Sequence, residues 1–184
     1  MKVTKTPIEG LLILEPRVFE DERGYFFEAF NNTRYEEAGI NQQFVQDNIS
    51  KSTYGTIRGL HYQVGDYAQG KLCQVLTGRV LDYAVDIRFG SPTFGMHFSL
   101  ELSEKNKKQF WLPAGFAHGF SVLSNEAVFH YKCTNYYNKE SERSIIYNDP
   151  DLNIDWSVPN PILSVKDLLG KKLNEIEEDF HYQK

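Results

Sequence analysis

Leu72-Cys-Gln-Val-Leu-Thr-Gly-Arg-Val-Leu-Asp-Tyr-Ala-Val-Asp-Ile87 is the stretch of sequence that predicts the fold class. Apolar residues recur at roughly every second position on both sides of Thr77-Gly78. A period of two is typical of β-strands, because successive side chains point to opposite faces of a sheet. Glycine after a polar residue is a turn signal. The stretch therefore predicts two strands joined by a tight turn.

The same short pattern continues outward in both directions. Eight candidate strands result, over residues 10–16, 56–63, 72–77, 79–87, 97–102, 109–113, 119–122 and 127–135. No long amphipathic helix separates them, so parallel βαβ units are excluded and an all-β sandwich or barrel is favoured. Helical turns are predicted over 33–38, with Thr33 as cap and Gly39 as stop, and from 164 onward, interrupted at Gly170 and continuing over 173–180. We expect one domain over residues 1–184, a double-sheet jelly roll with short peripheral and C-terminal helices.

Composition excludes several classes of protein. The chain has 184 residues, of which 41% are hydrophobic and 24% charged, so it is not a disordered chain. A formal charge of −5 gives no general attraction to nucleic acid or to an anionic membrane. Two cysteines make no disulfide framework, and the apolar run 11–14 is too short for a signal peptide or membrane span. We expect a cytoplasmic protein with no nucleic-acid or membrane partner.

Two familiar site patterns are incomplete. The run from Gly65 to Lys71 resembles a phosphate-binding loop, but Leu72 stands where such loops carry Ser or Thr, and no helix follows. None of the histidines is paired at the spacing of a jelly-roll metal site, and Gln63 follows His61 at ligand spacing. We therefore expect no nucleotide triphosphatase, no catalytic metal and no other cofactor.

Polar residues in the strand over 57–63 are the most unusual feature. Strict alternation places His61 on one face with Ile57, Gly59 and Gln63. Arg58 would then point to the other face, unless Gly59 marks a β-bulge. On the strand over 79–87, Asp82 and Asp86 share one face, as an acid–base pair or as a structural pair with Arg88.

Several polar segments in a fixed order carry a family resemblance. These are RGYFFEAF (23–30), FVQDNISKS (44–52), IRGLHYQ (57–63), QGKLCQVLTGRVLDYAVDIRFGSPTFG (69–95), FWLPAGFAHGF (110–120), AVFHYKCTNYY (127–137) and ILSVKD (162–167). Together they resemble the dTDP-4-dehydrorhamnose 3,5-epimerases over about residues 8–168. The resemblance implies a cupin-type jelly roll, a homodimer, and a dTDP-linked 4-keto-6-deoxyhexose as substrate, inverted at C3 and C5 without a cofactor.

The resemblance also assigns residues to the reaction. His61 is similar to the family's base, Tyr131 to its acid, and Lys71 is suited to hold the developing enolate oxygen. Asp167 resembles the partner of the base, although Asp82 and Asp86 remain alternatives for that position.

A further set of residues resembles the family's substrate-binding residues. Among them, Tyr137 corresponds to the tyrosine that stacks on thymine, and Arg23 and Glu28 lie in a segment that can cross to a partner subunit. The set is Arg23, Glu28, Gln46, Asp47, Asn48, Arg58, Lys71, His118, Tyr137, Glu142 and Lys166. The alternatives are an epimerase acting at one carbon, an epimerase for another nucleotide sugar, and a sugar-binding protein without catalysis.

Overall fold

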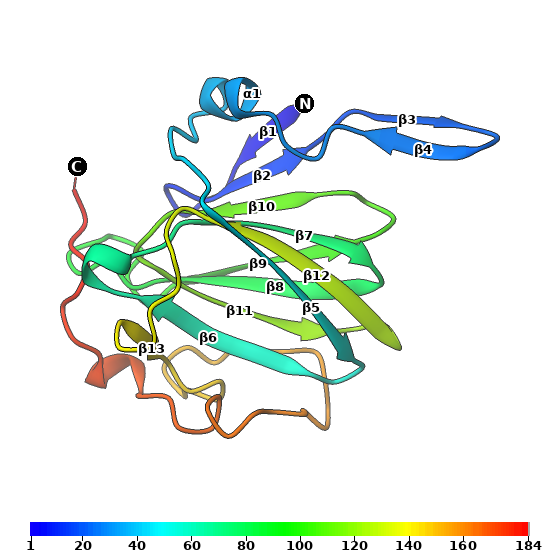
Figure 1. Ribbon diagram of the computed structural model, residues 1–184. Helices are drawn as coiled ribbons and strands as arrows, with labels where there is room; N and C mark the ends of the chain where they lie inside the picture. The colour runs from blue at the N-terminus through cyan, green and yellow to red at the C-terminus, as the bar shows by residue number, and fades with distance from the viewer. Residues whose placement is uncertain (184) are drawn as a thin grey trace.

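Two antiparallel sheets face each other in the computed structural model, which describes residues 1–183 (Figure 1). The six-stranded sheet has the order β1 (Lys2–Lys5), β2 (Leu12–Glu15), β10 (Gln109–Leu112), β7 (Lys71–Thr77), β12 (Glu126–Cys133) and β5 (Gln46–Thr53). The five-stranded sheet has the order β13 (Glu142–Ser144), β6 (Ile57–Gln63), β11 (Phe116–Val122), β8 (Arg79–Asp86) and β9 (His97–Ser103). A separate hairpin consists of β3 (Val18–Asp21) and β4 (Gly24–Phe27). The all-β jelly-roll class expected from the sequence is confirmed.

The turn at Thr77-Gly78 joins the two sheets, because β7 belongs to the six-stranded sheet and β8 to the five-stranded one. Gly78 has a φ of +80°, and a Cβ there would lie 2.1 Å from the carbonyl oxygen of Glu126. Only glycine tolerates both conditions. The chain therefore crosses between the sheets at this turn, and both of its strands are placed next to the interior of the sandwich.

Apolar side chains form three buried clusters. The first lies between the sheets and includes Phe110, Phe120 and Phe129. The second covers the outer face of the five-stranded sheet, where Trp156 and other residues of the C-terminal segment pack on strands β6, β8 and β11. The third packs helix α1 (Asn32–Glu37) and the segment after it on the outer face of the six-stranded sheet. The segments outside the sandwich are thus held by burial of apolar surface, the main favourable term in folding.

The predicted helices are only partly found. Helix α1 forms, but its cap is Asn31, whose side chain accepts a hydrogen bond from the backbone N–H of Arg34, and not Thr33. The predicted C-terminal helix is wrong. Residues 165–168 form turns, and over the described residues 164–183 the only helical element is the 3-10 helix η2 (Leu173–Glu175). The other 3-10 helix, η1 (Gly65–Tyr67), follows β6. The apolar residues of the C-terminal segment pack on the five-stranded sheet at irregular spacing. This segment is therefore held by packing on the sheet and not by a regular helix.

All eight predicted strands are present, but five further strands were missed. Strands β1 and β3 are exposed along their length, β4 is exposed except at Phe27, and β13 has three residues. Strand β5 is an edge strand with the polar sequence QDNISKST. Hydrophobic alternation does not identify such strands, since it reports burial of one face.

Strand β6 contains a bulge at Gly59. His118 of β11 is opposite His61 and Phe120 is opposite Arg58, so one extra residue lies on the β6 side. Strict alternation is therefore wrong here. Arg58, His61 and Gln63 face the interior of the sandwich, whereas Ile57 and Leu60 join the cluster under the C-terminal segment. The bulge is what allows the arginine and the histidine to share a face.

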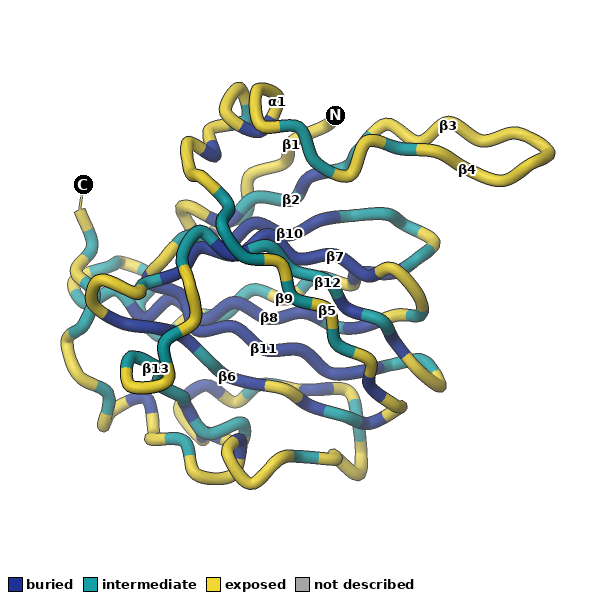
Figure 2. The backbone as a smooth tube through the Cα atoms, in the orientation of Figure 1, coloured by how far each residue is buried: buried dark blue, intermediate teal, exposed yellow. Residues whose placement is uncertain are grey.

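The β3–β4 hairpin extends away from both sheets (Figures 1 and 2). Several of its large apolar side chains are exposed, with Phe26 at 70% and Phe19 at 51% of their full accessible area. A two-stranded hairpin without a covering layer is marginally stable by itself. No helix among residues 1–183 is long and apolar enough to cross a membrane.

Gly59→Ala should destabilise the fold strongly. The φ of Gly59 is +135°, and a Cβ there would lie 2.4 Å from the Cα of Gly119. Gly24→Ala is the matched control, because its φ is +124° but nothing lies within 4 Å. We expect a loss of more than about 3 kcal/mol at Gly59, against about 1–2 kcal/mol for conformational strain alone at Gly24, in urea unfolding. Equal losses would mean that the contact with Gly119 carries no energy.

Candidate active site

A polar cavity of about 430 Å³ opens between the two sheets, beside the apolar cluster. This size is within the range of small-molecule sites. Its walls come from both sheets and from the C-terminal segment. The lining residues are Gln46, Asn48, Ser50, Arg58, His61, Tyr62, Gln63, Gln69, Lys71, His118, Phe120, Tyr131, Tyr137, Glu142, Ser164, Lys166 and Asp167.

His61 and Asp167 form a pair on the wall made by β6. The Nε2 atom of His61 lies 2.8 Å from Oδ1 of Asp167, although the ring nitrogen is not aligned for a regular hydrogen bond. The contact is therefore chiefly electrostatic. The imidazole remains partly exposed to the cavity, whereas the carboxylate is almost completely buried. The pairing of His61 with Asp167, rather than with Asp82 or Asp86, is the one that the structure contains.

Asp167 is held by the backbone of two segments. Its Oδ1 accepts a hydrogen bond from the N–H of Gly59 at 3.1 Å, and its Oδ2 accepts from the N–H and the hydroxyl of Ser164. Burial by itself would raise the pKa of Asp167, but these donors and His61 hold it well below its usual range. Asp167 is therefore a carboxylate at neutral pH, fixed on one side of the imidazole.

Tyr131 and Lys71 stand on the opposite wall, on the neighbouring strands β12 and β7. Burial raises the pKa of Tyr131 to about 12, so its hydroxyl keeps its proton at neutral pH. Burial lowers the pKa of Lys71, while nearby acidic groups oppose this shift. Within residues 1–183 no side-chain hydrogen bond engages either group. Both are free to meet a bound molecule.

A second histidine–aspartate pair closes the inner end of the cavity. Nε2 of His118 lies 2.7 Å from Oδ1 of Asp82, and 3.6 Å from the thiol of Cys73. Asp86 is not part of the site, because it accepts hydrogen bonds from Arg88, Ser91 and Thr93. Of the two aspartates singled out on β8, Asp82 therefore lies behind the cavity wall, in contact with His118, and Asp86 forms the structural pair with Arg88.

The mouth of the cavity is lined by connected polar side chains. Glu142 accepts a hydrogen bond from the Tyr137 hydroxyl at 3.0 Å and pairs with the ammonium of Lys166. Gln46 accepts from the backbone N–H of Tyr137 and donates to Asn48. The aromatic ring of Tyr137 remains about half exposed, which leaves a face open for stacking.

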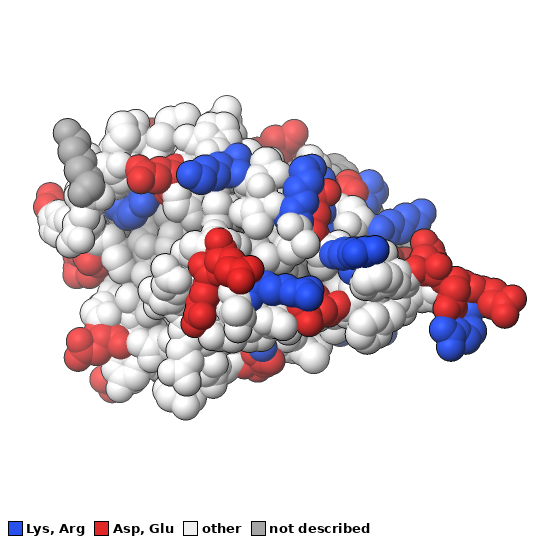
Figure 3. All heavy atoms as spheres, turned by 90° about the horizontal axis from the view of Figure 1, so that it is seen from above, with Lys and Arg blue, Asp and Glu red and all other residues white. Residues whose placement is uncertain are grey.

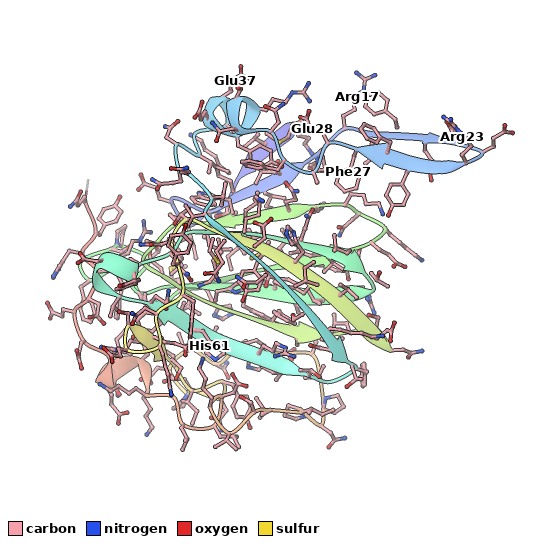
Figure 4. The ribbon with its side chains drawn as sticks, viewed as in Figure 1. Arg17, Arg23, Phe27, Glu28, Glu37 and His61 are labelled. Carbon is pink, nitrogen blue, oxygen red and sulfur yellow. The ribbon has the colours of Figure 1, made fainter. Side chains whose placement is uncertain are left out.

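Three residues expected at the site do not line this cavity. Arg23 lies at the tip of the hairpin and Glu28 just after it, both distant from His61 in Figure 4. Asp47 points to the other face of β5, where both its oxygens lie 2.8 Å from the ammonium of Lys132. On the face that carries α1 and the hairpin, acidic and basic side chains lie side by side (Figure 3). These three residues reach a substrate only if a second chain or a rearrangement brings one to them.

Ser50, Gln69 and Ser164 line the cavity but were missed from the sequence. Ser50 follows Gln46 and Asn48 at a period of two on β5, so alternation could have found it. Ser164 and Asp167 exchange hydrogen bonds in the manner of a helix-capping box, but no helix follows. Gln69 begins the resemblance segment over 69–95 and lies two residues before Lys71, so the same period of two could have found it.

The arrangement is suited to proton transfer on a bound carbon acid. A histidine stands on one wall, a protonated tyrosine and a buried ammonium stand on the opposite wall, and other cations lie at the mouth. The base and the acid can thus reach opposite faces of a ligand, and the ammonium can stabilise a developing negative charge.

Comparison with known proteins supports this chemistry. Residues 5–175 match the sequence model of the family described as dTDP-4-dehydrorhamnose 3,5-epimerase. The chain belongs to the dTDP-4-dehydrorhamnose 3,5-epimerase family. The epimerase of this name from Shigella flexneri is 57% identical over 173 residues, which cover 94% of this chain and 96% of that protein. The fold, the enzyme class and the function expected from the sequence are confirmed.

Solved structures show the same fold with different epimerase activities. The 3,5-epimerase from Legionella pneumophila in complex with dTDP-4-keto-L-rhamnose has a TM-score of 0.96 at 53% identity, covering 100% of this chain and 99% of that chain. A 3′-monoepimerase from Streptomyces bikiniensis in complex with dTDP-quinovose has a TM-score of 0.86 at 31% identity, covering 92% of this chain and 86% of that chain. The fold is thus compatible with inversion at one carbon or at two, and side chains in the cavity must distinguish them.

Asp167→Asn should destabilise this epimerase in a pH-dependent manner. The pKa of Asp167 is lower in the folded chain than in the unfolded chain. Its carboxylate therefore stabilises the fold above the unfolded pKa of about 3.9, and this contribution is lost as the pH falls further. We expect the difference in unfolding free energy between the native and variant chains to be constant from about pH 7 to 5 and to shrink toward pH 3.

Urea unfolding at each pH measures this difference, and Asp66→Asn, at an exposed carboxylate, is the control. A difference that is the same at all three pH values would contradict the assignment of Asp167 as the paired carboxylate.

Proposed function

We propose that the cavity epimerises a dTDP-linked 4-keto-6-deoxyhexose at C3 and C5, with His61 as the base and Tyr131 as the acid. The observation that carries the proposal is the placement of these two groups on opposite sheets. A 4-keto group acidifies the hydrogens on both neighbouring carbons. Inversion requires that a proton leaves on one face and that another arrives on the opposite face.

His61 is set up to accept the first proton. Its Nε2 faces Asp167, so Nδ1 is the ring atom directed to the substrate. When Nδ1 takes a proton from C3 or C5, the imidazolium gains the buried carboxylate as a counter-ion. Asp167 acts through His61 and is therefore a positioning residue. The ammonium of Lys71 stabilises the negative charge that develops on the C4 oxygen. Tyr131 then donates a proton to the carbon from the other face.

The mouth of the cavity supports recognition of the nucleotide. Arg58 and Lys166 supply positive charge for a diphosphate, and Tyr137 offers a ring face to a thymine base. Lys166 has to loosen its pair with Glu142 to meet a phosphate oxygen. Gln46 and Asn48, which are already joined to this loop, complete the polar wall.

The hairpin supports a homodimer as part of this proposal. Its exposed apolar side chains have no covering layer within the chain, and Arg23 and Glu28, which resemble substrate ligands, cannot reach their own cavity. A second copy of the chain would cover the exposed apolar side chains, because a two-fold interface buries the same patch on both chains. It would also offer Arg23 and Glu28 a cavity within their reach. Each hairpin would then complete the partner's site.

We also propose that the reaction takes place in the cytoplasm. Both cysteines are free and buried. Disulfides are common in proteins of oxidising compartments, so two free thiols favour a reducing compartment. Recovery of the active enzyme from outside the cytoplasm of its native host would contradict this location.

A deuterium wash-in tests the reaction and the roles together. In heavy water with dTDP-4-keto-6-deoxyglucose, the native enzyme should introduce one deuteron at C3 and one at C5, read by NMR and mass spectrometry. His61→Ala should lower turnover by at least about a thousandfold, the upper range for a general acid–base group. Tyr131→Phe should lose inversion at C5 and keep part of the exchange at C3, because the base can return a deuteron to the face it left.

The outcomes separate the alternatives. A single deuteron in the native product indicates a mono-epimerase and identifies its carbon. None, beside an active reference enzyme, would overturn the proposed substrate. An unchanged product spectrum with Tyr131→Phe would remove Tyr131 from the role of acid.

Complementation between two inactive chains tests whether the hairpin serves the partner's site. When His61→Ala and Arg23→Ala chains are co-expressed, a mixed dimer has one site with both residues intact. Random pairing gives such a site in about a quarter of all positions, so about a quarter of native activity should return. Arg17→Ala, at the base of the same hairpin, is the control and should be active alone (Figure 4). No recovery in the mixture would show that Arg23 acts within its own chain.

A further inference from the structure

Three side chains with metal-binding atoms meet at the inner end of the cavity. Cys73 comes from β7, Asp82 from β8 and His118 from β11, so the two facing sheets both contribute. One ligand atom from each lies within 4.8 Å of the others, and all three residues are buried. No sequence motif predicts this cluster, because its members come from separate strands at unrelated spacing.

The chemistry and the distances fit a thiophilic divalent cation. Thiolate, imidazole and carboxylate are the ligands of Zn²⁺, at about 2.0–2.3 Å, which places tetrahedral ligand atoms about 3.3–3.7 Å apart. Nε2 of His118 already lies 3.6 Å from Sγ of Cys73 and 2.7 Å from Oδ1 of Asp82. An ion therefore requires the carboxylate and the imidazole to separate by roughly half an ångström, a shift within reach of side-chain rotation.

A second observation points to a missing ligand. Asp82 is completely buried, and its Oδ2 has no hydrogen-bond partner among the residues that the structure describes. A buried carboxylate oxygen without a partner is unfavourable, and a cation would satisfy it. The opposing feature is Lys71, which precedes Cys73 by two residues on the same face of β7 and repels an incoming ion. This repulsion favours reversible binding rather than a permanent structural metal.

We propose that Cys73, Asp82 and His118 form an inhibitory site for Zn²⁺ or a similar thiophilic divalent cation. Entry is through the cavity, which His118 lines. On binding, the S–H bond of Cys73 breaks, a sulfur–metal bond forms, and the proton passes to solvent; the proton on Nε2 of His118 moves to Nδ1. The bound ion then fixes His118 and, because one proton leaves as it binds, adds one net positive charge beside Lys71. Turnover stops because the cavity can no longer arrange these groups around the substrate.

Cobalt absorption tests the site without any substrate. Co²⁺ bound by a thiolate has a charge-transfer band in the near ultraviolet, and we expect this band when the native enzyme is titrated with Co²⁺. Cys73→Val should lose it, since valine has no thiol; its side chain is apolar like the cluster around Cys73 and about one methyl group larger than that of cysteine. Cys133→Val, at the other buried cysteine, is the matched control and should keep it. Absence of the band from native protein, or its persistence in Cys73→Val, would overturn the site.

Inhibition tests the consequence. We expect Zn²⁺ to inhibit the native enzyme and Cys133→Val equally, chelation to reverse the inhibition, and Cys73→Val to need at least about a tenfold higher concentration. Equal inhibition of all three would show that Zn²⁺ acts elsewhere. This second experiment rests on the proposed epimerase activity, whereas the cobalt spectrum does not, so failure of one is distinguishable from failure of the other.

Discussion

The carboxylate of Asp167 is the point on which the site depends. It joins the C-terminal segment to β6 by accepting from the backbone of Gly59 and by facing the imidazole of His61. The site also depends on the bulge at Gly59, because the bulge turns Arg58 and His61 to the same face of β6. A Cβ at Gly59 would collide with Gly119. The position of the base is therefore set by one carboxylate and by the close approach of two glycines.

Distant apolar packing holds that carboxylate in place. The C-terminal segment has no regular helix or sheet over most of its length, so its own hydrogen bonds do not fix it. Instead Trp156 and Leu173 are buried against the outer face of the five-stranded sheet, and Ser121 of β11 donates a hydrogen bond to the backbone carbonyl of Trp156. The free energy that positions Asp167 thus comes from the side of the sheet opposite the cavity. A substitution there would act on the histidine without touching it.

How much the sequence could predict differed between the sandwich and its periphery. Strands with one buried face, such as β7 and β8, were found because burial leaves a period of two in the sequence. Strand β5 and the hairpin were not, since neither buries a continuous apolar face. The C-terminal helix was wrong because the apolar residues there serve irregular packing on a sheet, a tertiary effect that local pattern does not contain.

The site shows the same limit. Motifs that a family resemblance identified predicted four of the site residues, His61, Tyr131, Lys71 and Asp167. All four line the cavity in the structure. The orientation of Asp47 was not predicted, although its position between two cavity-lining residues of β5 requires it to face outward. The grouping of Cys73 with His118 lies beyond sequence reasoning, because it depends on the distance between two facing sheets.

A boundary between apolar and polar halves explains why one sandwich holds both a core and a cavity. Cys73, Phe120 and Phe129 belong to the cluster between the sheets, and Lys71 and Tyr131, two residues away on the same strands, line the cavity. Each strand thus passes from core to site within about one pleat repeat. Lys71 gains its buried position from this, and burial is what lowers its pKa. The same boundary leaves Asp82 with one oxygen on His118 and the other without a partner. Ionisable groups at such a boundary are poorly solvated by water, and the protein supplies only some of their hydrogen-bond and charge partners. The missing partners can therefore be supplied by a molecule or ion that enters the cavity.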